Sequence, residues 1–138
     1  MRALIFIAVA SILANGPAVA QSLKKQAACA AQAEIFYRAY INIRPTSGFK
    51  LESEDYQSHY NTKLNKCLIL INETSEYKGL VVISAELDDA FERRTFANYV
   101  LNLKTNTQYC HLTPTLDKTV PCSSRQEFDS FVAKYMEQ

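Results

Sequence analysis

The sequence of 138 residues has no tryptophan, only three glycines and only two histidines. It therefore lacks a glycine-rich phosphate-binding loop and a G-x-S-x-G nucleophile motif, and H-E-x-x-H is also absent. With His59 and His111 as the only histidines and no C-x-x-C pair, the sequence offers no recognisable zinc site. We predict no metal and no cofactor, and no motif assigns a catalytic residue.

An excess of one charge and a long apolar run are also missing. The 15 basic residues nearly balance the 14 acidic ones, which favours neither nucleic acid nor an anionic membrane surface as a partner. The apolar run at residues 3–13 is about 11 residues long, whereas a membrane-spanning helix needs roughly 20. We expect no nucleic-acid binding and no stable membrane insertion of the mature chain.

The short apolar run is typical of a secretory signal peptide. Arg2 precedes it, and Ala18-Val19-Ala20 forms an A-x-A cleavage site. Cleavage after Ala20 would remove residues 1–20, including Arg2, and leave residues 21–138 as one domain with 14 basic and 14 acidic residues. The sequence predicts a periplasmic or secreted protein.

All four cysteines lie in the predicted mature chain: Cys29, Cys67, Cys110 and Cys122. An even number in an exported chain indicates disulfides, and four cysteines allow three pairings. We predict a Cys110–Cys122 bridge, because a short polar segment with two prolines separates these residues, and this leaves Cys29 to pair with Cys67. The loop-entropy model assigns roughly 3 kcal/mol to the first bridge and roughly 4 kcal/mol to the second.

A helix is expected at each end of the mature chain. Over 22–43, helix-forming residues place Cys29, Ala33, Phe36 or Tyr37, and Tyr40 on one buried stripe. Near the C-terminus, Ser124 and Glu127 match the S-x-x-E capping box. The apolar residues that follow at helical spacing are Phe128, Phe131, Val132, Tyr135 and Met136.

Strands are expected at 54–75, 80–87, 95–103 and 108–113. The first of them becomes apolar on both faces after Leu64, as in a strand that is covered on both sides. Short connections favour an antiparallel meander. The predicted fold class is α+β: an antiparallel sheet of about four strands with both helices packed on one face, stabilised by disulfides. This order resembles cystatin-like and nuclear-transport-factor-like folds, an analogy of fold alone.

Two polar clusters are candidate sites. Alternation along residues 58–67, "SHYNTKLNKC", places His59, Asn61 and Lys63 on the face opposite Tyr60. These residues form either a polar recognition strip, with Tyr56 or Tyr60 near its edge, or an ordinary solvent-facing edge, and the candidate binding residues are His59, Tyr60, Asn61 and Lys63. The second cluster contains Glu86, Asp88, Asp89 and Glu92. Paired carboxylates can transfer protons or bind Ca²⁺, but Arg93 and Arg94 also offer simple surface pairing.

Several segments together resemble small exported bacterial proteins of uncharacterised function that carry an S-H-Y-N-x-K-x-x-K-C segment. They are residues 29–34, 58–67, 87–99 and 127–137. The resemblance implies an exported bacterial product and assigns no catalytic residue.

Three functional hypotheses follow. The first is a non-catalytic binding module for another envelope protein or an envelope ligand, with an inhibitor as one form. The second is a small hydrolase or isomerase that uses His59 with Asp88 or Asp89, which a shared pocket would favour. The third is a structural envelope component, which an exposed apolar patch would indicate. The oligomeric state stays open.

Overall fold

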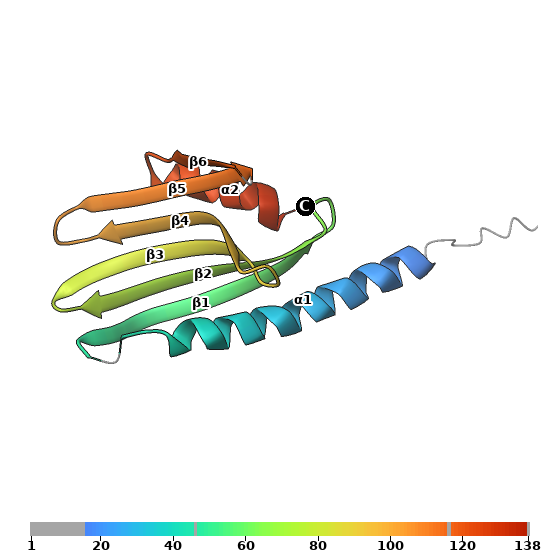
Figure 1. Ribbon diagram of the computed structural model, residues 1–138, viewed down its shortest axis with the longest axis horizontal. Helices are drawn as coiled ribbons and strands as arrows, with labels where there is room; N and C mark the ends of the chain where they lie inside the picture. The colour runs from blue at the N-terminus through green and yellow to red at the C-terminus, as the bar shows by residue number, and fades with distance from the viewer. Residues whose placement is uncertain (1–15, 46, 116, 138) are drawn as a thin grey trace, which may run out of the picture.

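The computed structural model describes residues 16–45, 47–115 and 117–137 as one sheet with a helix at each end of the sequence (Figure 1). The predicted signal peptide, residues 1–20, lies mostly outside the described residues. The elements are α1 (Gly16–Asn42), β1 (Phe49–Asn61), β2 (Lys66–Tyr77), β3 (Leu80–Asp89), β4 (Arg94–Asn102), β5 (Thr107–Thr115), β6 (Lys118–Pro121) and α2 (Arg125–Met136). The strands form an antiparallel meander in the order β1 to β6.

Residues in the left-handed backbone region close the hairpins between the long strands. The four-residue turns 62–65, 90–93 and 103–106 each end on such a residue: Asn65 (φ 54°), Arg93 (φ 54°) and Asn106 (φ 53°). Asparagine tolerates this conformation better than most residues, so Arg93 is the unusual member of the set. The β2–β3 hairpin turns on Lys78 and Gly79, both with positive φ, as a two-residue hairpin loop requires.

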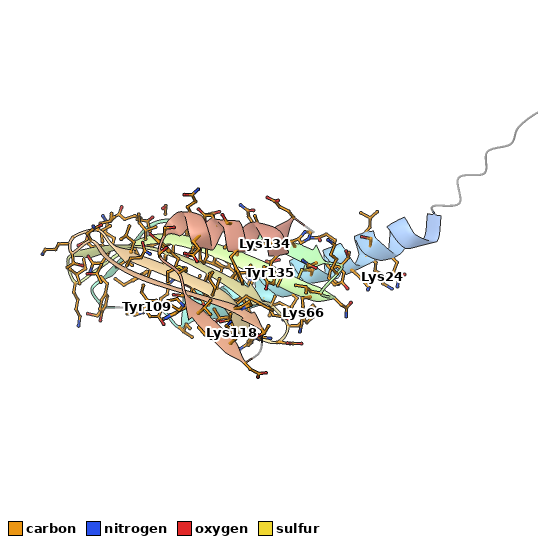
Figure 2. All side chains as sticks on the ribbon, turned by 90° about the horizontal axis from the view of Figure 1, so that it is seen from above. Lys24, Lys66, Tyr109, Lys118, Lys134 and Tyr135 are labelled. Atoms are coloured by element: carbon orange, nitrogen blue, oxygen red, sulfur yellow. A yellow bond between two sulfur atoms is a disulfide. The ribbon has the colours of Figure 1, made fainter. Side chains whose placement is uncertain are left out.

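The two helices pack on opposite faces of the sheet. Cys67, Ile69 and Ile71 of β2 belong to the buried cluster under α1, whereas Leu68 and Leu70 pack in the cluster under α2. Successive side chains of a strand point to opposite faces, so β2 is covered on both. Figure 2 shows α2 along the upper side of the sheet. The prediction that both helices lie on one face is wrong.

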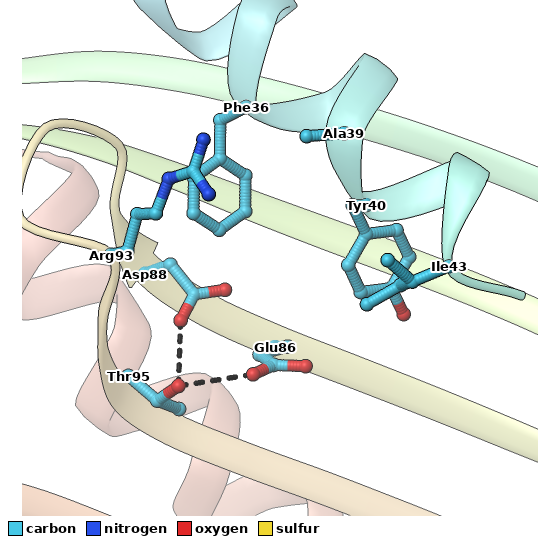
Figure 3. A pocket seen from close by; sticks show the side chains of 8 residues that line it. All are labelled: Phe36, Ala39, Tyr40, Ile43, Glu86, Asp88, Arg93 and Thr95. Carbon is cyan, nitrogen blue, oxygen red and sulfur yellow. Dashed lines mark hydrogen bonds between the residues drawn. The ribbon is translucent and has the colours of Figure 1, made fainter.

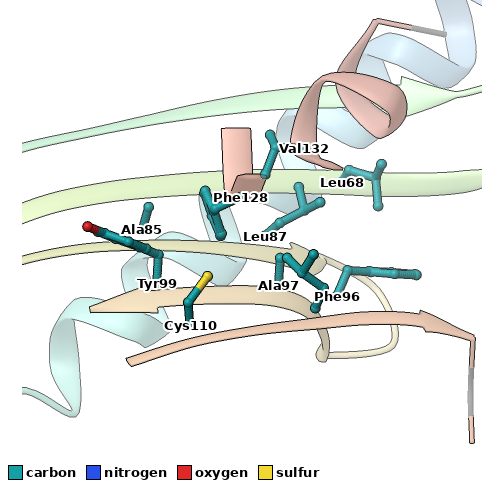
Figure 4. Close-up of a cluster of buried hydrophobic side chains, with 10 residues drawn as sticks. Leu68, Ala85, Leu87, Phe96, Ala97, Tyr99, Cys110, Phe128 and Val132 are labelled. Atoms are coloured by element: carbon teal, nitrogen blue, oxygen red, sulfur yellow. The ribbon is translucent and has the colours of Figure 1, made fainter. Parts of the chain in front are cut away.

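The larger core lies between α2 and strands β2 to β5 (Figure 4). Phe128 is fully buried there, and its ring centroid lies 5.9 Å from that of Tyr99. Ser124 caps the helix by accepting a hydrogen bond from the backbone N–H of Glu127, as predicted. The Glu127 carboxylate accepts from Ser123 instead of the cap residue, so the capping box is displaced by one position.

Helix α1 is fixed to β1 and β2 by a disulfide and by polar contacts. Cys29 on α1 is bonded to Cys67 on β2, with a Cα–Cα distance of 5.2 Å. At the end of α1, Arg44 pairs with Glu73 at 2.6 Å and also with Glu54, all three being largely buried. This clamp holds the C-terminal turns of α1 against the sheet.

Both disulfide pairings are confirmed. The second bridge joins Cys110 on β5 to Cys122, which lies just before α2. The Cα atoms of these two cysteines are 5.1 Å apart. Two disulfides are typical of proteins that mature in an oxidising compartment. Among the helices that the structure describes, none is long and apolar enough to cross a membrane.

The predicted α+β class and meander are confirmed, but the sheet has six strands instead of about four. The segment predicted as one strand over 54–75 is two strands, because the chain reverses at 62–65. That turn contains neither glycine nor proline and depends on Asn65 for its left-handed residue. The short β6 was not predicted either.

Candidate functional site

A cavity of about 350 Å³ opens between the C-terminal half of α1 and strands β3 and β4 (Figure 3). Its lining is Phe36, Ala39, Tyr40, Ile43, Glu86, Asp88, Arg93 and Thr95. We call it the α1–β3 cavity. The α1 side is apolar and aromatic, whereas the sheet side carries two carboxylates.

The carboxylates of Glu86 and Asp88 share one hydroxyl group. Glu86 and Asp88 are two positions apart on β3 and point to the face that α1 covers, since Glu86 pairs with Ile71. The Thr95 hydroxyl lies 2.7 Å from Asp88 Oδ1 and 3.0 Å from Glu86 Oε1. A hydroxyl has one hydrogen, so Thr95 can donate to only one carboxylate at a time.

Burial shifts the titration of the cavity residues toward their neutral forms. Asp88 is 3% exposed, and desolvation together with the Glu86 charge raises its pKa to about 7. Desolvation also raises the pKa of Glu86. Burial, with Glu73 and Glu86 nearby, raises the pKa of Tyr40 to about 12, so this phenol stays a hydrogen-bond donor at neutral pH. The Asp88 carboxyl group can therefore take up or release a proton near neutral pH.

Within the described residues, neither Glu86 nor Asp88 forms an ion pair. Arg93 is the one cation among the residues that line the cavity (Figure 3). A buried carboxylate without a cation must either take up a proton or hold a positively charged ligand. The cavity is thus electrostatically incomplete at pH values above 7.

The acidic wall continues onto a part of the sheet that α1 does not cover. Glu86 pairs with Asn98 of β4, and Asn98 pairs with His111 of β5, so the three side chains form a row on this face. Tyr109 lies two residues before His111 on β5 and is 55% exposed. The ring centroids of Tyr109 and His111 are 4.3 Å apart. A ligand in the cavity could extend along this open row.

The four residues of the predicted recognition strip do not form one site. His59 lines a separate hollow beside Val132 and Met136 of α2. Tyr60 packs under α1, where its hydroxyl accepts from Lys25 and donates to Asn65. Asn61 is fully buried, and Lys63 is exposed in the turn at 62–65. The predicted outward position is therefore wrong for Asn61, and Lys63 faces solvent from a turn instead of from a strand.

The structure does not bring His59 together with Asp88 or Asp89, the two acidic residues predicted to act with it. His59 faces α2, whereas Asp88 faces α1 on the other side of the sheet. Asp89 is separated from His59 by β2, where Leu68 pairs with both. Asp89 accepts hydrogen bonds from the backbone N–H groups of residues 91 and 92 and pairs with Lys66 at 3.1 Å, which makes it a turn-forming residue.

Asn61 ties the first hairpin to α2. Its side chain donates to the Tyr135 carbonyl at 2.8 Å and accepts from the Leu64 N–H at 2.9 Å. Because Asn61→Ala leaves both backbone groups without these partners, we expect it to lower the free energy of unfolding by about 2 kcal/mol. Urea denaturation measures this change. Lys63→Ala should stay within about 0.5 kcal/mol of wild type, and equal effects of the two variants would refute the assignment.

The sequence indicated the carboxylates but not the residues around them, which are Tyr40 and Thr95 in the cavity lining and Asn98 and His111 in the row beside it. The available signal was the placement of Glu86 and Asp88 at alternate positions around the buried Leu87. Among the described residues, no group of three or more histidines, cysteines or carboxylates could hold a metal ion. No protein-family model, curated protein or solved structure matches the chain, so its geometry carries the functional argument.

Proposed function

We propose that the protein is a small exported bacterial binding module, periplasmic or secreted, that holds its ligand in the α1–β3 cavity. The observation that carries this proposal is the buried carboxylate of Asp88, which faces a cavity beside the half-buried Glu86. Neither carboxylate forms an ion pair among the described residues. Burying a carboxylate without a counter-ion destabilises a fold, and such a group at the wall of a cavity marks a candidate functional site.

The construction of the cavity supports binding by a preformed site. The Cys29–Cys67 bridge and the buried Arg44 clamp fix α1 on either side of the cavity wall. A rigid wall reduces the entropy that a ligand loses on binding. The two disulfides, the signal peptide predicted at residues 1–20 and the resemblance of residues 58–67 support export.

The test is a screen of small organic fragments of mixed charge against the protein purified from the periplasm, followed by backbone amide NMR shifts. We expect the largest shifts at residues 86–88 and 36–43. Ala39→Leu fills the cavity and should abolish these shifts, whereas Ala30→Leu, on an exposed position of the same helix, should preserve them. Shifts that persist in Ala39→Leu, or that gather around His59, would overturn the proposal.

A second candidate function is proton transfer at the same cavity. The pKa of about 7 for Asp88 favours it, because a general acid or base works best near the operating pH. The carboxyl pair then replaces His59 as the titrating group of the hydrolase or isomerase hypothesis. Turnover of a bound fragment, lost in Asp88→Asn while binding persists, would distinguish catalysis from binding alone.

A further inference from the structure

We propose that the α1–β3 cavity recognises an alkylammonium group, carried either by a free amine or by a lysine side chain. This inference rests on the proposed function and names its ligand class. It joins three features of the cavity: two carboxylates without a counter-ion, two aromatic rings facing them, and an apolar wall for an alkyl stem.

The carboxylates provide the charge and the hydrogen-bond acceptors. Asp88 is 3% exposed. Among the described residues, its carboxylate accepts a hydrogen bond from Thr95 alone, at Oδ1. The Thr95 hydroxyl also lies within hydrogen-bond distance of Glu86, which has a second hydrogen bond with the side chain of Asn98. When Thr95 donates its one hydrogen to Glu86, Asp88 loses that donor. An ammonium group brings three donors and one positive charge, which matches the groups left in need of a partner.

The opposite wall suits the rest of such a ligand. The rings of Phe36 and Tyr40 lie across the cavity from Asp88 and Glu86 (Figure 3). Aromatic faces attract cations, and the effect grows when water is excluded. Ala39 and Ile43 add aliphatic surface beside these rings, on which a short alkyl chain can lie. A naked divalent ion would use none of this apolar surface.

Arg93 is the one cation in the lining, and it competes with the proposed ligand. It occupies a left-handed turn position where the matching turns of this protein have Asn65 and Asn106. Arg93→Asn should therefore be accommodated by the turn while it removes the competing charge. We expect this variant to bind n-butylammonium about threefold more tightly than wild type.

The test is calorimetric titration of the protein purified from the periplasm with n-butylammonium at pH 8, above the pKa of about 7 for Asp88. Asp88→Asn and Glu86→Gln should each weaken binding about tenfold or more. Asp129→Asn, an exposed carboxylate on α2, is the matched control and should bind like wild type. Thermal unfolding at the same pH verifies that each variant is folded.

Two further probes separate the ligand classes. If Nα-acetyl-lysine amide binds more tightly than n-butylammonium, the ligand is a lysine side chain. If n-butylammonium binds more tightly, the ligand is a free amine. Either result supports the proposal. Binding of 1-butanol as tight as that of n-butylammonium, or displacement of n-butylammonium by Ca²⁺, would overturn the ligand class while leaving the cavity as a binding site. No cavity binding by any fragment would instead refute the proposed function.

Discussion

Replacing Cys29 and Cys67 together by alanine is expected to lower the free energy of unfolding by about 4 kcal/mol. The bridge joins residues 38 positions apart, so its loss frees a long loop in the unfolded chain. Both residues are also buried at the centre of the contact between α1 and β2. Because whole domains are stable by only about 5 to 15 kcal/mol, the variant should lose a large share of its stability.

Urea denaturation with fluorescence of the tyrosines measures this loss, and limited proteolysis shows where the structure opens. The matched control is the double variant Cys110→Ala/Cys122→Ala, whose bridge spans 12 positions and should contribute about 3 kcal/mol. In the first variant we expect early cleavage within α1. A larger loss from the control pair, or an α1 that resists cleavage, would contradict the role assigned to the helix-to-sheet bridge.

Asp88→Asn is expected to stabilise the protein at pH 8 and to have little effect near pH 4. The pKa of Asp88 is raised from 3.8 to about 7 in the folded state, mainly by burial. Between these values the folded protein retains a proton that the unfolded chain releases, so wild-type stability falls as the pH rises from about 4 to about 7. A shift of roughly three units corresponds to about 4 kcal/mol.

Asparagine cannot ionise, so the difference between the variant and wild type should grow across this pH range. Urea titrations at pH 4, 6 and 8 test it. Glu127→Gln is a control of opposite sign, because hydrogen bonds from Ser123 lower the pKa of Glu127. Its stabilising contribution is present above the ordinary pKa of glutamate and is lost as the pH falls. A pH-independent effect of Asp88→Asn would refute the buried, uncompensated carboxylate.

The same substitution connects stability with function. Asp88→Asn should make the protein more stable at pH 8 and should also weaken binding of n-butylammonium. Loss of binding in a variant that is more stable cannot be attributed to unfolding. Such a trade-off, in which a substitution raises stability and weakens function, is common at binding sites.

Local patterns predicted the elements that depend on neighbouring residues. The cap at Ser124 and the stripe from Phe128 to Met136 need only helical spacing, and the structure confirms both. The apolar run of β2 also contained the evidence for cover on both faces, since Cys67 and Leu68 point in opposite directions. The pattern does not say which helix covers which face, because helix placement depends on contacts far apart in the sequence.

The candidate site was harder to predict than the fold. The acidic cluster predicted from the sequence divides in the structure: Glu86 and Asp88 line the cavity, whereas Asp89 and Glu92 pair with Lys66. What makes Asp88 unusual is its burial under α1, more than 40 residues earlier in the sequence. A local sequence pattern does not reveal a contact between residues so far apart in the chain. For the same reason, the alternation that correctly placed His59 on a strand could not show which helix covers its face.

The two disulfides, the two helices and the antiparallel order of the strands could be predicted from the sequence, because cysteine spacing, residue periodicity and turn length can be read along the chain. The placement of α1 and α2 on opposite faces, and the opening that α1 leaves beside Glu86 and Asp88, could be learned only from the folded chain. The reason is desolvation: the charge state and reactivity of a carboxylate depend on what covers it, and here the cover comes from a distant part of the chain.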